Sequence, residues 1–241
     1  MEKTKTQGKR RYRKLKRLQE LPDFSTLPAV CADAAFILQH AHSTASALFK
    51  AYQLLRRRRT AERGMTTDEE QDLLRAMLVM TAAGLDGMAK RLIRDSLPKL
   101  ALSLTEARKG LRRFIASQLA ATGESAANFM ADILSGQDHF GQVIERYIVQ
   151  LTGGSLQSVD EILSTAAALG VTKDELGIDI QKLKQTFAVR NAIIHELDMN
   201  LSGERRKRNI RREKDMTEMV ELLFSLSSGL IRKVAERLGD A

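Results

Sequence analysis

The chain has 241 residues, of which 43% are hydrophobic and 29% are charged, so it is long enough to bury a sizeable core in one large domain or two small ones. Its 39 Lys and Arg against 30 Asp and Glu give a formal net charge of +9. The single cysteine, Cys31, excludes an intramolecular disulfide and a zinc site built from thiols, and no apolar run approaches the roughly 18 residues of a membrane span. We therefore expect a soluble, cytoplasmic protein with no membrane contact.

Most of the positive charge lies in residues 1–20, where nine Lys and Arg stand against Glu2 and Glu20 and so contribute +7 of the +9. Clustered positive charge favours contact with nucleic acid, because it displaces condensed counterions. A solvated terminal tail is the alternative. The residues of this arm predicted to bind an RNA backbone are Lys9, Arg10, Arg11, Arg13 and Lys14.

The composition predicts an all-α fold, because Ala, Leu, Arg, Lys, Glu and Met dominate and no convincing strand pattern is present. We expect a helical bundle with long N-terminal, motif-bearing and C-terminal helices and shorter helices between them. Two of the three prolines fall in residues 21–28, which predicts an irregular connector. The chain thus divides into a basic arm and connector, residues 1–28, and one helical domain, residues 29–241.

The helix boundaries follow from capping residues and breakers. Thr67 and the acidic residues after it are typical of a helix start, and Pro98 is expected to end that helix. Glycines mark several of the other boundaries between predicted helices. The expected helices cover about 29–59, 67–97, 105–121, 124–134, 137–151, 155–169, 179–201 and 213–238, with a turn over 171–177.

Inside the predicted helix over 179–201, Arg190, Asn191 and His195 place a cation, an amide and an imidazole within about two turns. Asn191 and His195 share one polar stripe with Asp198, whereas Arg190 points about 140° away from His195. Asn191 and His195 are expected at the margin of the core. The alternative is a helix-end histidine satisfied by Asp198 or solvent. The neighbouring apolar stripe is expected to hold Ile180, Leu183, Phe187, Ile194 and Leu201.

The string from Arg190 to Asp198, Arg-Asn-Ala-Ile-Ile-His-Glu-Leu-Asp, resembles the signature of the HEPN superfamily of helical ribonucleases and nucleotide-binding domains, in which Arg and a polar residue precede His by three spacers. It is most similar to prokaryotic branches in which Glu and then Asp follow the histidine. A second stretch, Ala82-Ala83-Gly84-Leu85-Asp86-Gly87-Met88, is similar to the small, apolar, Leu-Asp pattern of those branches. The resemblance spans residues from about 30 to 238.

The resemblance implies a metal-independent endoribonuclease without a cofactor, in which the 2′-hydroxyl of RNA attacks the adjacent phosphorus and leaves 2′,3′-cyclic phosphate and 5′-hydroxyl ends. His195 and Arg190 would be its catalytic pair, and Asn191 would position them. It also implies a homodimer with a shared active site, and a toxin or effector role with an antitoxin or defence-complex partner protein. The alternatives are a non-catalytic HEPN module that binds nucleic acid or protein, and a basic helical scaffold outside the family. Candidate supporting residues are Glu196, Asp198 and Asp86.

A second basic cluster follows the motif, in the loop expected to begin at Ser202 and Gly203. Its place shortly after His195 makes it a candidate clamp for the RNA backbone, and a solvated loop is the alternative. The run from Arg56 to Arg59 is interpreted as a structural helix end, where cations meet the helix dipole. The predicted clamp residues are Arg205, Arg206, Lys207 and Arg208.

No metal site is expected from the histidines. His40 and His42 are two residues apart in a predicted helix, so their side chains lie on nearly opposite faces and cannot hold one ion. His139 is expected on the surface near a helix start. No glycine-rich phosphate loop of the Walker or dinucleotide type is present.

Overall fold

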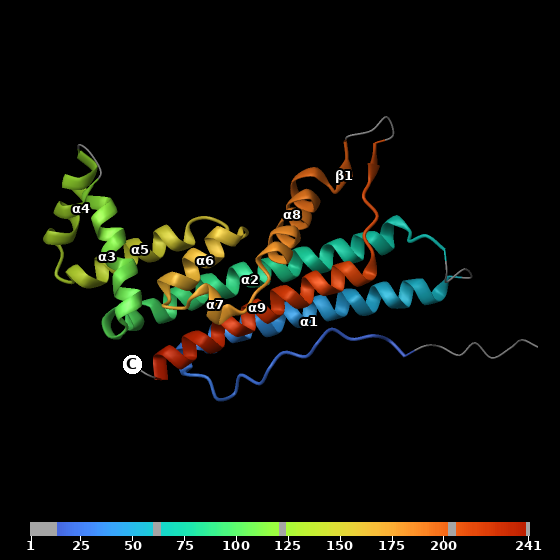
Figure 1. Ribbon diagram of the computed structural model, residues 1–241, viewed down its shortest axis with the longest axis horizontal. Helices are drawn as coiled ribbons and strands as arrows, with labels where there is room; N and C mark the ends of the chain where they lie inside the picture. Colours follow the sequence, from blue (N-terminus) through green and yellow to red (C-terminus); the bar gives the residue numbers. More distant parts are fainter. Residues whose placement is uncertain (1–13, 60–63, 121–123, 202–205, 240–241) are drawn as a thin grey trace, which may run out of the picture.

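The computed structural model describes residues 14–59, 64–120, 124–201 and 206–239. Within these residues the protein is an all-α bundle with one short β-hairpin (Figure 1). The elements are α1 (Ala29–Arg58), α2 (Asp68–Ser103), α3 (Thr105–Leu119), α4 (Glu124–Ser135), α5 (His139–Thr152), α6 (Val159–Ala168), α7 (Lys173–Leu176), α8 (Ile180–Glu196), β1 (Met199–Asn200), β2 (Lys207–Arg208) and α9 (Glu213–Gly239).

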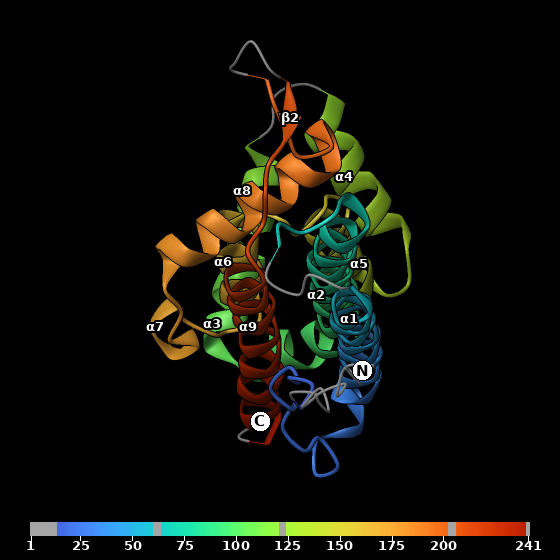
Figure 2. The same cartoon turned by 90° about the vertical axis from the view of Figure 1, so that its right-hand side faces the viewer.

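Three long helices form the frame of the molecule. The helices α1, α2 and α9 lie side by side, and Figure 2 shows them almost end-on. In Figure 1, α3, α4 and α5 gather at one end of this frame, whereas α8 crosses α2 and carries the hairpin away from the bundle at the other end. Buried leucines, methionines and alanines from the three long helices form most of the core. The expected helical bundle is confirmed.

A close helix crossing joins α1 to α2. A Cβ atom placed on Gly84 would lie 2.2 Å from the Cβ of Ala41, well inside van der Waals contact. Both residues are buried, as are Ala34, Ala45 and Ala82 in the same two helices. The small residues let the two backbones approach, so the pattern around residues 82–88 has a packing function in this protein.

The start of α2 is a capping box. The Thr67 hydroxyl accepts a hydrogen bond from the Glu70 amide, and the Glu70 carboxylate accepts one from the Thr67 amide. The side chain of Glu70 is fully buried and forms ion pairs with Arg56 at 3.2 Å and Arg59 at 3.0 Å. Two members of the Arg56 to Arg59 run therefore tie the end of α1 to the start of α2, as expected for a structural helix end.

Pro98 does not end α2, which was the expectation, because the helix continues to Ser103. A proline inside a helix costs about 3 kcal/mol through the missing hydrogen bond and the steric clash. Leu97, Leu100 and Ala101 lie on either side of it with at most 1% of their surface exposed. Burying two leucine side chains contributes about 1.5–3 kcal/mol each, which is enough to offset the cost of the proline.

The motif-bearing helix α8 ends at Glu196 and not near residue 201, the predicted end. Leu197 and Asp198 both adopt the left-handed conformation, with φ of 51° and 58°, and the Asp198 amide donates to the Ala192 carbonyl at 2.8 Å. The chain then forms β1, which pairs antiparallel with β2. The sequence predicted no strand here, because two residues per strand are too few to show an alternating pattern.

Residues 14–28 pack against α1 and α9. Leu18 and Phe24 are buried in the core, and the backbone N–H and C=O of Lys16 bond the side-chain amide of Gln53 at 2.7 and 3.0 Å. His42 Nε2 donates to the Gln19 carbonyl at 2.9 Å. The segment over 21–28 has no regular secondary structure, as predicted. Among the helices of the described ranges, none combines the length and the hydropathy needed to cross a membrane.

Candidate functional site

The helix α8 turns a partly polar face toward the core. Its buried residues are Leu183, Thr186, Phe187, Arg190 and Ile193, which recur at three- and four-residue spacing. The predicted apolar stripe is wrong at its C-terminal end, because the side chain of Ile194 is 38% exposed and that of Leu201 is 62% exposed. Leu183 and Phe187 are buried as predicted, but the core face also includes Thr186, Arg190 and Ile193.

Arg190 is only 8% exposed on this face, although it carries a full positive charge. Its Nη1 donates to the Asn191 Oδ1 at 3.0 Å, while its Nε has no hydrogen-bond partner within the described residues. Burial lowers the pKa of the guanidinium from its ordinary value, and the negative charge of Asp86 opposes that shift. A buried cation with an unpaired donor is costly, so the fold holds Arg190 in this position at the expense of stability.

Asp86 holds the surroundings of Arg190 in place. It lies in α2, and its Oδ1 accepts the backbone amide of Leu156 at 2.7 Å. Its Oδ2 forms an ion pair with Lys90 at 2.9 Å, one helical turn along. One carboxylate thus faces two cations, Lys90 and Arg190, and also anchors the loop between α5 and α6. Asp86, one of the candidate supporting residues, is therefore held in α2 by these contacts, and its charge acts on Arg190 of the motif.

His195 and its neighbours lie on the opposite side of α8. His195, Asn191 and Glu196 are all exposed, and His195 makes no hydrogen bond or ion pair within the described part of the chain. The expected position of Asn191 and His195 at the core margin is therefore wrong, because the core face of α8 is centred near Arg190. A single chain does not bring the imidazole and the Arg190 guanidinium into contact.

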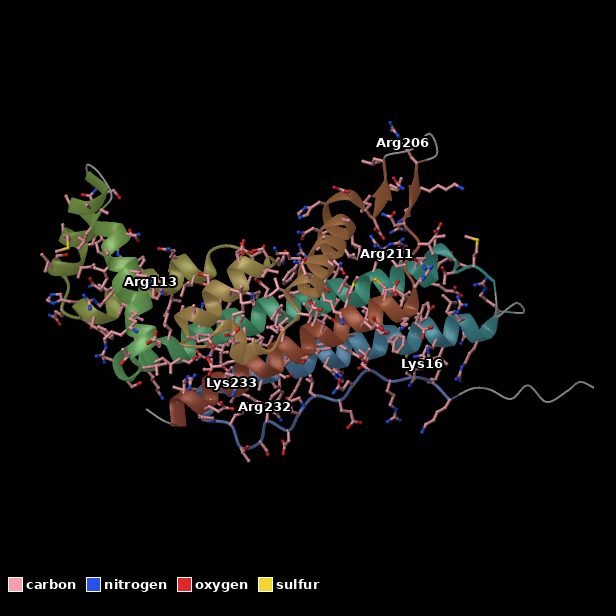
Figure 3. The ribbon with its side chains drawn as sticks, viewed as in Figure 1. Lys16, Arg113, Arg206, Arg211, Arg232 and Lys233 are labelled. Carbon is pink, nitrogen blue, oxygen red and sulfur yellow. The ribbon has the colours of Figure 1, made fainter. Side chains whose placement is uncertain are left out.

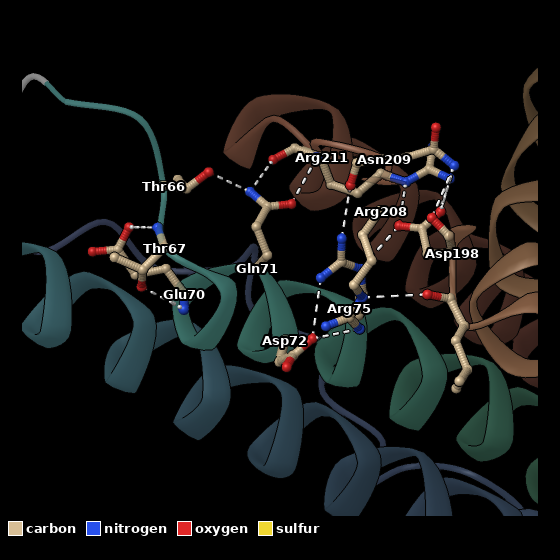
Figure 4. A network of polar contacts seen from close by, with 11 residues as sticks. Thr66, Thr67, Glu70, Gln71, Asp72, Arg75, Asp198, Arg208, Asn209 and Arg211 are labelled. Carbon is tan, nitrogen blue, oxygen red and sulfur yellow. Dashed lines mark hydrogen bonds and ion pairs between the residues drawn. The ribbon is translucent and has the colours of Figure 1, made fainter. Parts of the chain in front are cut away.

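Asp198 is fully buried and belongs to a separate network (Figure 4). Its carboxylate accepts from Arg75 Nε at 2.9 Å, from Arg211 Nε at 3.0 Å and from Asn209 Nδ2 at 3.1 Å. Burial by itself raises the pKa of this carboxyl, but the hydrogen bonds from Arg211, Arg75 and Asn209 outweigh it and hold the pKa below its usual value. Asp198 therefore does not contact His195 and instead fixes the hairpin after α8. Of the alternative, a helix-end histidine satisfied by Asp198 or solvent, the contact with Asp198 is wrong, whereas the exposed imidazole is open to solvent.

The hairpin is bound to α2 by several side chains that the sequence did not single out. Gln71 accepts the Arg211 amide at 2.7 Å and donates to the Arg211 carbonyl at 2.9 Å, and Arg75 Nη2 donates to the Asn209 carbonyl at 2.7 Å. Arg208 forms an ion pair with Asp72 at 2.6 Å. The local signal for this contact is the group of polar residues at positions 71, 72 and 75, which precedes the apolar stretch from residue 76 to 80.

The residues predicted to clamp the RNA backbone differ in their exposure and in their ion pairs. Arg206 and Lys207 are exposed, and Figure 3 shows Arg206 at the far end of the hairpin. Arg208 is half-buried and paired with Asp72, so it acts partly as a structural anchor. Lys14 in the arm is exposed. Four of the predicted RNA-binding residues, namely Lys9, Arg10, Arg11 and Arg13, lie outside the described residues, and so does Arg205.

The described residues hold no group of three or more His, Cys, Asp or Glu side chains that could bind a metal ion. Cys31 is buried, and burial, followed by the charge of Asp95, raises the pKa of its thiol to about 11. Comparison of the chain with protein-family models, with curated proteins and with solved structures finds no match.

Proposed function

We propose that this protein is a metal-independent endoribonuclease of the HEPN type, in which Arg190, Asn191 and His195 act on one phosphodiester. The observation that carries the proposal is the buried guanidinium of Arg190, whose Nε has no partner in the described chain and which shares a helix with the exposed imidazole of His195. An imidazole can accept and donate protons near neutral pH, as attack by a 2′-hydroxyl requires. A guanidinium stabilises the extra charge of the phosphorane.

The proposal assigns the complete site to two copies of the chain, because one copy keeps Arg190 and His195 in separate environments. The surface beside His195 supports this arrangement. Leu197, Leu201 and Ile210 are between 62% and 69% exposed and lie at the end of α8 and in the segments of the hairpin. Exposed apolar side chains grouped in this way are typical of an interface, and soluble oligomers are most often two-fold dimers. The protein acts on RNA and is the toxin or effector of a defence or toxin–antitoxin system.

The test is cleavage of RNA by the purified protein in the presence of a chelator. We expect His195→Ala to lower the rate about 10²–10⁴-fold, which is the usual contribution of a general acid or base, with unchanged helical content. His139→Ala is the matched control, because His139 is also exposed and lies at the start of α5, away from α8. Equal rates for the wild-type chain and His195→Ala would refute the assignment, as would cleavage that the chelator abolishes.

A second candidate function is a non-catalytic module that binds nucleic acid or protein. The same arginine favours it, since a guanidinium that is 8% exposed and bonded to Asn191 can be a structural element of the helix packing. In that case, His195→Ala would leave RNA binding unchanged and no preparation of the protein would release 2′,3′-cyclic phosphate ends. Analysis of the product ends therefore separates the two functions.

A further inference from the structure

Five segments of the chain meet at the end of the bundle where α1 ends and α2 begins. The backbone of Lys16 bonds Gln53 in α1, and its side chain forms an ion pair with Glu213 at the start of α9 at 2.7 Å. The ion pairs of Glu70 join α1 to α2, and the Gln71 contacts join α2 to the segment after the hairpin. These contacts close a ring that links the arm, α1, α2, the segment after the hairpin and α9.

The carboxylates of this ring are turned inward. The side chains of Glu70 and Asp198 are fully buried, and that of Glu213 is 25% exposed, each in an ion pair with Lys or Arg. Asp72 lies on the surface but pairs with Arg75 and Arg208. Asp68 and Glu69 are exposed in the first turn of α2, where they favour the helix dipole. Glu70, Asp72, Asp198 and Glu213 are thus paired with cations, whereas Glu20, Asp68, Glu69 and Asp215 are exposed and form no ion pair within the described residues.

The cations of this end face outward. Arg57 is half-buried, the others are exposed, and none of them forms an ion pair with another described residue. In Figure 3, Lys16 lies at the lower edge of the bundle beside α1 and Arg206 lies at the upper edge in the hairpin, whereas Arg113 lies toward the other end of the long axis. An array of unpaired cations on four segments exceeds what a helix end requires, and it attracts a polyanion. These cations are Lys14, Arg17, Lys50, Arg57, Arg58, Arg206, Lys207 and Arg212.

A hollow of about 530 Å³ lies inside this surface, between the arm and α1. Its lining includes the apolar side chains of Leu15, Leu18 and Phe49, together with His42, Ser46 and the carboxylate of Glu20. Its cations, Lys14, Lys16, Arg17 and Lys50, come from both segments. The volume is within the range of roughly 300–1,000 Å³ that small-molecule sites occupy. Apolar walls beside a basic groove are the features that accept a base and its phosphate in single-strand binders.

We infer that this basic end is a binding site for single-stranded RNA, in which the cations on the arm, α1 and the hairpin contact the phosphates and the hollow accepts one nucleotide. The inference gives Arg57 and Arg58 a function in contacting substrate, beyond the helix-end role that their position suggested, and it assigns the same function to Lys50. It rests on the proposed function only for the identity of the polyanion as RNA. The hairpin connects this surface to the end of α8, where His195 lies.

The test measures binding of a fluorescein-labelled 20-nucleotide single-stranded RNA by anisotropy at several salt concentrations. The binding measurements use the chain with His195→Ala, so that the RNA stays intact. We expect Arg57→Gln/Arg58→Gln and Arg17→Gln/Lys50→Gln each to remove two phosphate contacts. The slope of log affinity against log salt should then fall by about 1.4, since each contact to single strands contributes about 0.7, and the affinity at 0.1 M salt should fall about 25-fold.

Arg112→Gln/Arg113→Gln is the matched control, because these two adjacent arginines are exposed, lie in α3 and form no ion pair within the described residues. We expect its affinity and salt slope to match those of the parent chain. Test pairs that bind like the parent, or a control pair that loses as much as the test pairs, would overturn the inference. Cleavage is measured separately without His195→Ala, so a failure of the nuclease proposal is distinct from a failure of this binding surface.

Discussion

Replacing Gly84 with alanine tests the packing that places Asp86 beside the motif helix. The added Cβ would lie 2.2 Å from the Ala41 Cβ, which is 1.2 Å less than the 3.4 Å at which ordinary contact begins. Overpacking of this kind costs about 1–3 kcal/mol, and the clash with a short, rigid side chain favours the upper value. Alanine has a higher helix propensity than glycine, which adds about 1 kcal/mol to the free energy of unfolding. We therefore expect the free energy of unfolding to fall by about 2 kcal/mol.

The assay is urea unfolding followed by far-UV circular dichroism, with two further variants. Gly229→Ala is the control, because Gly229 also lies inside a helix but a Cβ there meets no atom within 4 Å, so this change should stabilise the protein by about 0.5–1 kcal/mol. Ala41→Gly combined with Gly84→Ala removes the clash, and the double variant should recover at least 1 kcal/mol beyond additivity. The reasoning is refuted if Gly84→Ala is as stable as the wild-type chain, or if Ala41→Gly gives no recovery.

Three further predictions follow from the described contacts. Asp198→Asn leaves buried cations uncompensated, so we expect a loss of about 3–5 kcal/mol in urea unfolding at pH 7. The folded-state pKa of Asp198 is lowered, so its stabilisation is present above the unfolded pKa and is lost as pH falls through the folded value. The difference in stability should therefore shrink as pH falls below 3.8, the ordinary pKa of an aspartate. Leu197→Gly should raise the melting temperature by relieving about 1 kcal/mol of left-handed strain at an exposed position, and an unchanged value would contradict this. Cys31 should resist a thiol reagent at pH 8 until the protein unfolds, because burial raises its thiol pKa to about 11; rapid labelling of the native chain would show that the thiol is accessible.

The helices themselves could be predicted from the sequence, because their signals are local. Thr67 and the acidic residues after it cap α2 where expected, and the predicted spans of about 29–59 and 213–238 differ by one residue from α1 and α9. A cap and an amphipathic stripe depend on neighbours within about four positions, so no tertiary information is needed to recognise them. The irregular connector over 21–28 was predictable for the same reason.

The spacing of Arg190, Asn191 and His195 along a helix could also be predicted from the sequence. Which of their side chains are buried was decided by tertiary structure. The packing of α8 against α2 buries Arg190 and Ile193 and leaves Ile194 and His195 exposed. The catalytic roles of these residues stay a prediction that the geometry alone does not test.

Charge and helical periodicity are therefore determined by the sequence itself, whereas the partners of buried polar groups are determined by the fold. Asp198 shows the difference most clearly, since its partners Arg75 and Arg211 lie 123 and 13 residues away along the chain. The same holds for α2, which continues through Pro98 because its last turns are buried in the core. Buried charges and a helical proline are tolerated only where long-range contacts offset their cost, and such contacts leave no local pattern in the sequence.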